Sequence, residues 1–113
     1  MKIFLDTADI NQIQSRLGTG LIDGITTNPT LIAKSHRKPD DVYRELIVMG
    51  VKDISMEVVG NAPEMINEGL RLADIFGDHT TVKVPCTPDG LMACRELARN
   101  HHIRVNVTLI FNS

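Results

Sequence analysis

A single lysine stands in the middle of a short β-type run at Thr80–Pro85. Side chains alternate between the two faces of a strand, so Lys83 points away from the face that carries Val82 and Val84. If the valines cover the outer face, the lysine points inward, where loss of solvent favours its neutral amine. A neutral amine is a nucleophile that forms Schiff bases with carbonyl substrates. The alternative is an edge-strand lysine that reaches into water, because charged side chains are rarely buried.

Further polar residues recur in, or at the C-terminal ends of, the other predicted strands. They are Asp6, Asn28, Glu57, Asn106 and Thr108. Taken singly, Asp6 could cap a helix, Asn28 could serve a turn, and Glu57 could be an edge charge. Successive strands that each bring a carboxylate, an amide or an amine to the same edge favour a shared site instead. This recurrence favours the inward orientation of Lys83.

The elements that would position these residues alternate between strand and helix patterns. Short apolar runs predict strands at residues 2–5, 21–26, 54–59, 80–85 and 104–111. Apolar residues spaced by three and four predict helices around residues 10–17, 42–49, 65–73 and 91–98, with a short apolar piece around 31–32. The last helix carries its apolar residues at Leu91, Cys94, Leu97 and Ala98. This alternation predicts an α/β protein with a parallel sheet.

Two parallel architectures compete, an open doubly wound sheet and a (β/α) barrel. A dinucleotide-binding sheet would carry a glycine-rich loop after its first strand, whereas residues 6–9 read Asp-Thr-Ala-Asp, and the sequence has no Walker A motif. A barrel gathers its active site at the C-terminal ends of its strands, which is where the polar residues recur. We therefore expect a TIM-barrel type fold, with residues 1–113 forming a single domain of about the first five strands and four helices of the eight-stranded barrel.

The composition and charge of the chain argue against a membrane protein and a nucleic-acid-binding protein. The 113 residues allow one domain with a modest core, and 42% hydrophobic and 23% charged residues are typical of a globular protein. No apolar run approaches the roughly 20 residues that span a bilayer. Asp6 and Asp9 interrupt any signal-peptide pattern, so we expect a cytoplasmic protein without a membrane partner. A net charge of −2 offers no basic stripe for nucleic acid.

Neither the cysteines nor the histidines predict a metal site. Cys86 and Cys94 are too few for a disulfide scaffold and match no zinc spacing, so we expect free thiols. His101 and His102 are adjacent near a predicted helix end and would project about 100° apart, which makes them poor co-ligands.

Four segments, taken together, resemble successive signature segments of the transaldolase family, especially its short bacterial and phage-type members. They are residues 4–8 (FLDTA), 24–32 (GITTNPTLI), 82–85 (VKVP) and 106–111 (NVTLIF). The resemblance covers the whole chain in order, as the N-terminal part of a class I (Schiff-base) (β/α)8 barrel. It implies transfer of a dihydroxyacetone unit between sugar phosphates such as fructose 6-phosphate and erythrose 4-phosphate, in the pentose phosphate pathway of carbohydrate metabolism, without a metal or cofactor.

The resemblance also implies a role for each matched residue. Lys83 resembles the Schiff-base lysine, and Asp6 resembles the carboxylate that handles the proton of the substrate hydroxyl. Glu57 and Thr108 resemble the pair that holds the catalytic water. The positions that hydrogen-bond the substrate match Thr26, Asn28 and Asn106.

Two alternatives stay open beside transaldolase activity. The related fructose-6-phosphate aldolases release free dihydroxyacetone and tend to carry glutamine where this chain has Glu57, so the glutamate favours transaldolase. The family keeps its phosphate-binding arginine and serine on later strands, and we expect Arg95, Arg99 and Arg104 to be surface charges rather than substitutes. The chain could therefore be a truncated half-barrel or an assembly element without activity of its own. Because open sheet edges recruit other strands, we also expect a homo-oligomer.

Overall fold

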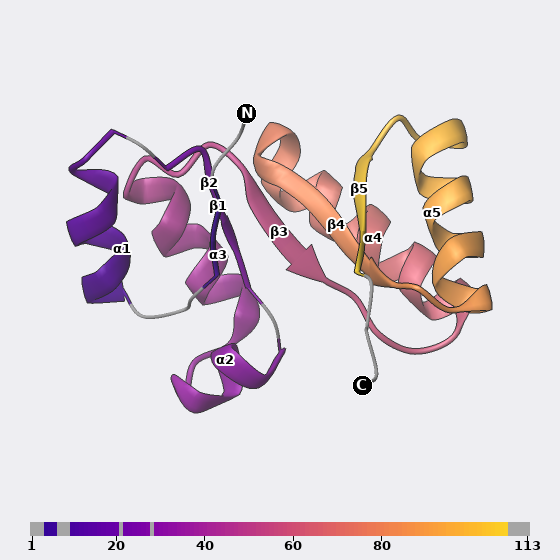
Figure 1. The fold of residues 1–113 in the computed structure, drawn as a ribbon. Coiled ribbons are helices and arrows are strands. Elements are labelled where there is room, and N and C mark those ends of the chain that lie inside the picture. The colour runs from indigo at the N-terminus through magenta and orange to yellow at the C-terminus, as the bar shows by residue number, and fades with distance from the viewer. Residues whose placement is uncertain (1–3, 7–9, 21, 28, 109–113) are drawn as a thin grey trace. The chain divides into compact units, whose positions relative to one another are not determined.

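A computed structural model of the protein describes residues 4–6, 10–20, 22–27 and 29–108 (Figure 1). The chain divides into two compact units, Met1–Ser55 and Met56–Ser113. The boundary falls inside strand β3 (Ile54–Glu57), so each unit contains one end of this strand.

The first unit alternates short strands with helices. In chain order it holds β1 (Phe4–Asp6), α1 (Ile10–Leu17), β2 (Gly24–Thr26), α2 (Pro29–Lys34), α3 (Pro39–Val48) and the start of β3. β1 pairs with β2 in parallel, and β2 pairs in parallel with β3, where Ile25 is the partner of Ile54. The amide of Ile25 donates to the carbonyl of Asp53 (2.9 Å) and so holds the start of that pairing.

Apolar side chains from both kinds of element form the core of the first unit. Ile13 on α1, Leu46 on α3 and Ile25 on β2 are fully buried. α3 begins with Pro39 in its first turn, a position where the missing N–H of proline is harmless. Acidic residues follow in the same turn and complement the positive end of the helix dipole.

The second unit positions the lysine strand. It holds the end of β3, then α4 (Ala62–Phe76), a short 3₁₀ turn (Gly77–His79), β4 (Thr80–Pro85), α5 (Pro88–Asn100) and β5 (Arg104–Thr108). β4 and β5 pair in parallel over five residues, from Thr81 with Arg104 to Pro85 with Thr108. Both long helices contact β4, and α5 also contacts β5. Their fully buried side chains include Met65 on α4 and Leu97 on α5.

The predicted α/β class with parallel strands is confirmed. Several element boundaries differ from the prediction. The second and third strands are shorter than predicted, at Gly24–Thr26 and Ile54–Glu57, and the apolar piece around residues 31–32 is a helix, α2. Residues 2–3, 21 and 109–111 of the predicted strands lie outside the described residues. No helix within the described part of the chain is long and apolar enough to cross a membrane.

Candidate active site

The side chains of β4 alternate between the two faces of the strand, as its sequence predicts. Val82 and Val84 are fully buried, and the side chain of Lys83 between them is 16% exposed. Thr81, on the same face as Lys83, is also almost completely buried. Lys83 therefore lies in a mostly buried position that water still reaches.

Glu57, the last residue of β3, lies beside this lysine. Its Oε2 is 3.9 Å from Nζ of Lys83, and its side chain is 25% exposed. The amide of Val58 donates to the carbonyl of Lys83 (3.0 Å), which holds the end of β3 against β4. The separation exceeds that of a direct hydrogen bond, so the two side chains are coupled by charge. A proton could pass between them through an intervening water.

Two further predicted site residues lie on the neighbouring strand of the same unit. Asn106 is the register partner of Lys83, and Thr108 is the partner of Pro85. In-register residues of parallel strands project to the same face, and so do residues two apart along one strand. Lys83, Asn106 and Thr108 thus share one face of the β4–β5 pair, with Asn106 exposed and Thr108 half-buried.

The remaining predicted site residues belong to the first unit. Asp6 ends β1 and Thr26 ends β2, and the two residues are register partners. Asn28 lies outside the described residues. Thr27, next to it in the predicted motif, is fully buried, and its hydroxyl donates to the carbonyl of Ser55 (3.1 Å). A meeting of Asp6, Thr26 and Asn28 with Lys83 stays a prediction.

The sequence reasoning missed the backbone groups that support the lysine strand. The amide of Cys86 donates to the carbonyl of Thr108 (3.0 Å), and the amide of Thr87 donates to the carbonyl of Pro85 (2.9 Å). A signal existed, because Cys86 and Thr87 directly follow the lysine strand and lead into a helix with Pro88 in its first turn. Both cysteine thiols, at Cys86 and Cys94, are free.

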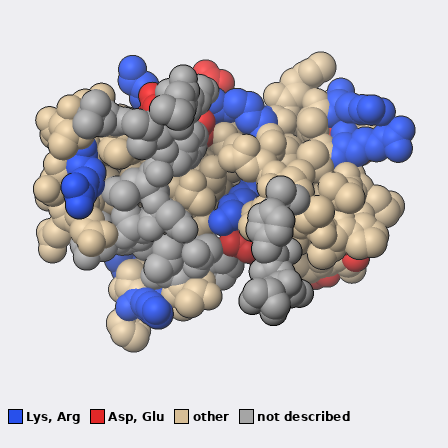
Figure 2. Space-filling view, in the orientation of Figure 1, with Lys and Arg blue, Asp and Glu red and all other residues tan. Residues whose placement is uncertain are grey.

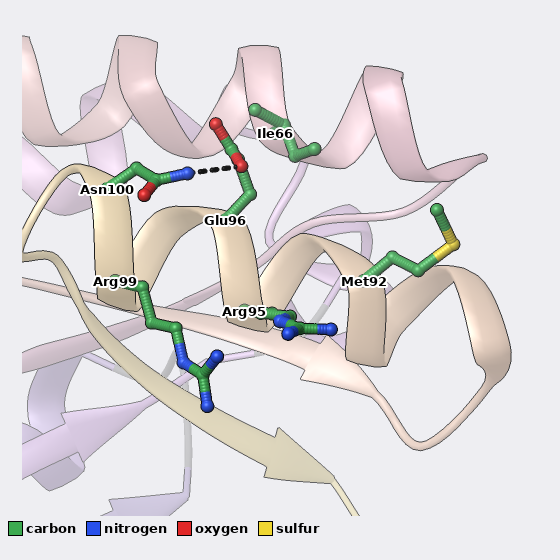
Figure 3. Close-up of a pocket in the computed structure, with 6 residues that line it drawn as sticks. All are labelled: Ile66, Met92, Arg95, Glu96, Arg99 and Asn100. Atoms are coloured by element: carbon green, nitrogen blue, oxygen red, sulfur yellow. Dashed lines mark hydrogen bonds between the residues drawn. The ribbon is translucent and has the colours of Figure 1, made fainter.

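A groove on the second unit runs between α4 and α5 and is separate from the lysine pair (Figure 3). It encloses about 460 Å³ and is lined by Ile66 of α4 and by Met92, Arg95, Glu96, Arg99 and Asn100 of α5. In Figure 3, Glu96 and Asn100 are joined by a hydrogen bond (2.7 Å). Neither Lys83 nor Glu57 lines this groove.

The three arginines near the end of the chain were predicted to be surface charges. Arg95 and Arg99 are exposed, and Figure 2 shows basic side chains over the C-terminal part of α5. Arg104 is also exposed, but its guanidinium donates to the backbone carbonyls of Asp78 and Thr80, so it additionally ties β5 to the start of β4. None of the three lies next to Lys83 in register, since Arg104 is paired with Thr81.

These features define a class of protein, a parallel α/β fold with a strand lysine beside a carboxylate. The chain belongs to the Transaldolase/Fructose-6-phosphate aldolase family, whose family model matches residues 3–113.

Curated relatives agree with this assignment. The chain is 48% identical over 113 residues to a protein of Nitrosopumilus maritimus named "Probable transaldolase", covering 99% of this chain and 50% of the relative. It is 49% identical over 112 residues to a protein of the same name from Geobacter sulfurreducens, covering 98% and 51%. A third, from Thermoplasma acidophilum, is 44% identical over 115 residues, covering 99% and 51%. The chain thus spans about half the length of the curated relatives it matches.

Proposed function

We propose that the chain carries the Schiff-base half of a transaldolase active site, with Lys83 as the covalent residue. The observation that carries this proposal is the 3.9 Å separation of Lys83 Nζ and Glu57 Oε2, with both side chains mostly buried. A lysine amine forms Schiff bases with carbonyl substrates, and the Glu57 carboxylate beside it can accept a proton and, once protonated, return it. Membership of the family supports the same assignment.

The first chemical stage forms an imine on Lys83. The amine nitrogen attacks the ketone carbon of a ketose phosphate such as fructose 6-phosphate, and the resulting carbinolamine loses water. Proton transfers to and from the carbinolamine oxygen pass between Glu57 and a water that Thr108 helps to hold. The product is a protonated imine, which can accept the electron pair of an adjacent carbon–carbon bond.

The second stage breaks and remakes that bond. Asp6 accepts the proton of the substrate hydroxyl, the carbonyl of the departing aldose phosphate forms, and the bond electrons move to the imine nitrogen to give an enamine. The enamine attacks the aldehyde carbon of an acceptor aldose phosphate such as erythrose 4-phosphate, and Asp6 returns its proton to the new hydroxyl oxygen. Hydrolysis of the new imine then frees Lys83. The residues proposed to hydrogen-bond substrate and intermediate are Thr26, Asn28 and Asn106.

This chemistry needs the strand ends of both units at one site. We therefore propose that residues 1–113 form the N-terminal half of a single (β/α)8 barrel domain. Within the first unit, Asp6 and Thr26 are register partners at the C-terminal ends of β1 and β2, which is where a barrel places its active site. The proposed enzyme is cytoplasmic and homo-oligomeric, acts on sugar phosphates in the pentose phosphate pathway, and needs no cofactor, nucleic acid or membrane.

A second candidate activity is cleavage that releases free dihydroxyacetone, as in fructose-6-phosphate aldolase. The description of the matching family names both activities, and this supports the second candidate. The glutamate at position 57, in place of the glutamine that is usual in the aldolases, favours transfer over release. A fragment or assembly element without turnover is the third possibility.

Covalent trapping tests the proposal. The chain is incubated with fructose 6-phosphate, the imine is reduced with borohydride, and the labelled lysine is located by peptide mass mapping. We expect the label on Lys83 and its loss in Lys83→Met. The exposed residues Lys34, Lys38 and Lys52 serve as internal controls. Labelling of these lysines as fast as Lys83 would contradict the assignment. Release of dihydroxyacetone without transfer to erythrose 4-phosphate would favour the aldolase activity.

A further inference from the structure

The first turn of α5 approaches the end of the lysine strand unusually closely. Gly90 is the third residue of this helix, and a Cβ at that position would lie 1.9 Å from the carbonyl oxygen of Pro85 and 3.0 Å from its carbonyl carbon. Glycine inside a helix costs about 1 kcal/mol relative to alanine, so helix propensity does not explain its presence. The close backbone contact with Pro85 does explain it.

The same helix turn is fixed by its cap. The hydroxyl of Thr87 accepts a hydrogen bond from the amide of Gly90 (3.0 Å), as an N-cap side chain does. The amide of Thr87 in turn donates to the carbonyl of Pro85 (2.9 Å). Gly90, Thr87 and Pro85 therefore connect the start of α5 to the end of β4 through two hydrogen bonds and one close backbone contact.

The segment between Lys83 and Pro85 is held on both other sides as well. Towards β3, the carbonyl of Lys83 accepts from the amide of Val58 (3.0 Å). Towards β5, the residue after Pro85, Cys86, donates its amide to the carbonyl of Thr108 (3.0 Å). A displacement of Pro85 would therefore move Lys83 and strain its links to both neighbouring strands.

From these contacts we infer that Gly90 is a positioning residue for Lys83. Because Gly90 has no side chain, the first turn of α5 can contact the Pro85 carbonyl directly. This contact fixes the position of the C-terminal end of β4 and thereby the position of Lys83 Nζ relative to Glu57 and Thr108. This role rests on the proposed function of Lys83. It adds a residue that touches no substrate and acts only through the backbone.

The size of the expected effect follows from the contact. Real Cβ atoms essentially never come within 3.0 Å of such a neighbour, so Gly90→Ala requires a shift of roughly 1 Å between the helix turn and Pro85. A misplacement of about 1 Å remote from the reacting atoms can slow an enzymatic reaction about 100-fold. The contacted atom is backbone, so rotation of a side chain cannot relieve the clash.

The test compares two glycines of the second unit. Gly69→Ala is the matched control, because its Cβ would meet the flexible side chain of Leu97 (Cδ1 at 2.8 Å) and would not touch the Pro85 carbonyl. It would reach Cγ2 of Val82 only at an ordinary contact distance of 3.5 Å. Both variants are treated with fructose 6-phosphate and borohydride, and the rate of labelling at Lys83 is measured. Amide hydrogen exchange of Cys86 is followed by NMR, together with the circular dichroism of the chain.

We expect Gly90→Ala to label Lys83 about 100-fold more slowly than the unmodified chain and to lose protection of the Cys86 amide, with its helical signal retained. Gly69→Ala should label at close to the original rate. Equal labelling rates in a folded Gly90→Ala variant would overturn the inference.

If Gly90→Ala does not fold, Thr87→Val decides the question. It removes the cap that fixes the same turn and leaves the glycine in place, so severalfold slower labelling in a folded chain supports the role, and an unchanged rate contradicts it. An unmodified chain that never labels at Lys83 would instead refute the proposed function on which the role depends.

Discussion

Glu57→Gln separates two roles that the carboxylate could have beside Lys83. The change removes one charge and keeps the shape of the side chain. At 3.9 Å, two unit charges attract by about 4 kcal/mol in a medium of effective dielectric constant ~20. Water still reaches both side chains, at 16% and 25% exposure, and ion pairs that water screens contribute about 1 kcal/mol or less. A role as counter-charge alone would therefore change the rate by no more than about fivefold.

A role in proton transfer predicts a larger loss. General acid–base catalysis contributes about 10²–10⁴-fold, so Glu57→Gln should slow both turnover and the trapping of the imine on Lys83 by that factor. Release of free dihydroxyacetone should become more prominent relative to transfer. The two products are measured side by side in one reaction, and the trapping rate is measured separately, because it requires only the first chemical stage.

Glu68→Gln provides the matched control. Glu68 forms an exposed ion pair with Arg71 on the surface of α4, so the same substitution there removes a charge in the same unit without touching the lysine strand. We expect no change in trapping or in the ratio of products. If Glu57→Gln also left the rate and the ratio unchanged, Glu57 would be only a strand residue, and a loss limited to about fivefold would leave it the role of counter-charge.

Two further predictions concern stability and are measured by urea unfolding. Leu97→Ala empties a fully buried position on α5 and should lower the free energy of unfolding of the second unit by about 2–5 kcal/mol. Leu91→Ala, on the same helix but 50% exposed, should change it by no more than about 0.5 kcal/mol, and equal losses would mean that the helix faces the core differently. Asn61→Ala removes the capping box in which Asn61 and Glu64 exchange hydrogen bonds of 2.9 and 3.1 Å, and should cost about 0.5–2 kcal/mol. Asn67→Ala, on the exposed side of the same helix, should not destabilise the chain.

The alternation of strands and helices could be predicted because each element carries a clear hydrophobic period. The orientation of Lys83 followed from a period of two, and the buried Val82 and Val84 agree with it. The proximity of Glu57 to Lys83 could also be predicted from the order of the strands. Glu57 and Lys83 lie on strands that are consecutive in sequence, and consecutive strands in βα units are commonly neighbours in the sheet.

The buried face of α5 was predicted less well. Its apolar spacing suggested Leu91, Cys94, Leu97 and Ala98, whereas the buried residues are Gly90, Ala93 and Leu97. Large apolar residues are usually assigned to the core, but two of the three buried residues of this helix are small, and at Gly90 the backbone approaches Pro85 of β4 closely. Leu91 is half exposed, at 50%. A pattern that weighs only hydrophobicity cannot detect so close an approach.

The end of β3 shows a related error. The predicted strand continued to Val59, but the observed strand stops at Glu57 and Val59 is largely exposed. Gly60 has a positive φ of 111°, a conformation that glycine adopts without strain, and it turns the chain into the capping box of α4. The strand therefore ends two residues before the predicted end at Val59, where the chain turns at Gly60.

The side chains predicted to carry the chemistry and the backbone contacts that support them are not equally easy to recognise in the sequence. The residues predicted to react, Lys83 among them, could be singled out by their type and spacing. The contacts that hold Lys83 in place are made by the amides of Val58, Cys86 and Thr87 and by the absence of a side chain at Gly90. Backbone amides occur at almost every position, so no residue type marks these contacts. Substitutions at Gly90 and Thr87 should therefore affect the chemistry according to how far they move the Pro85 carbonyl, and only weakly according to the polarity of the residue that is introduced.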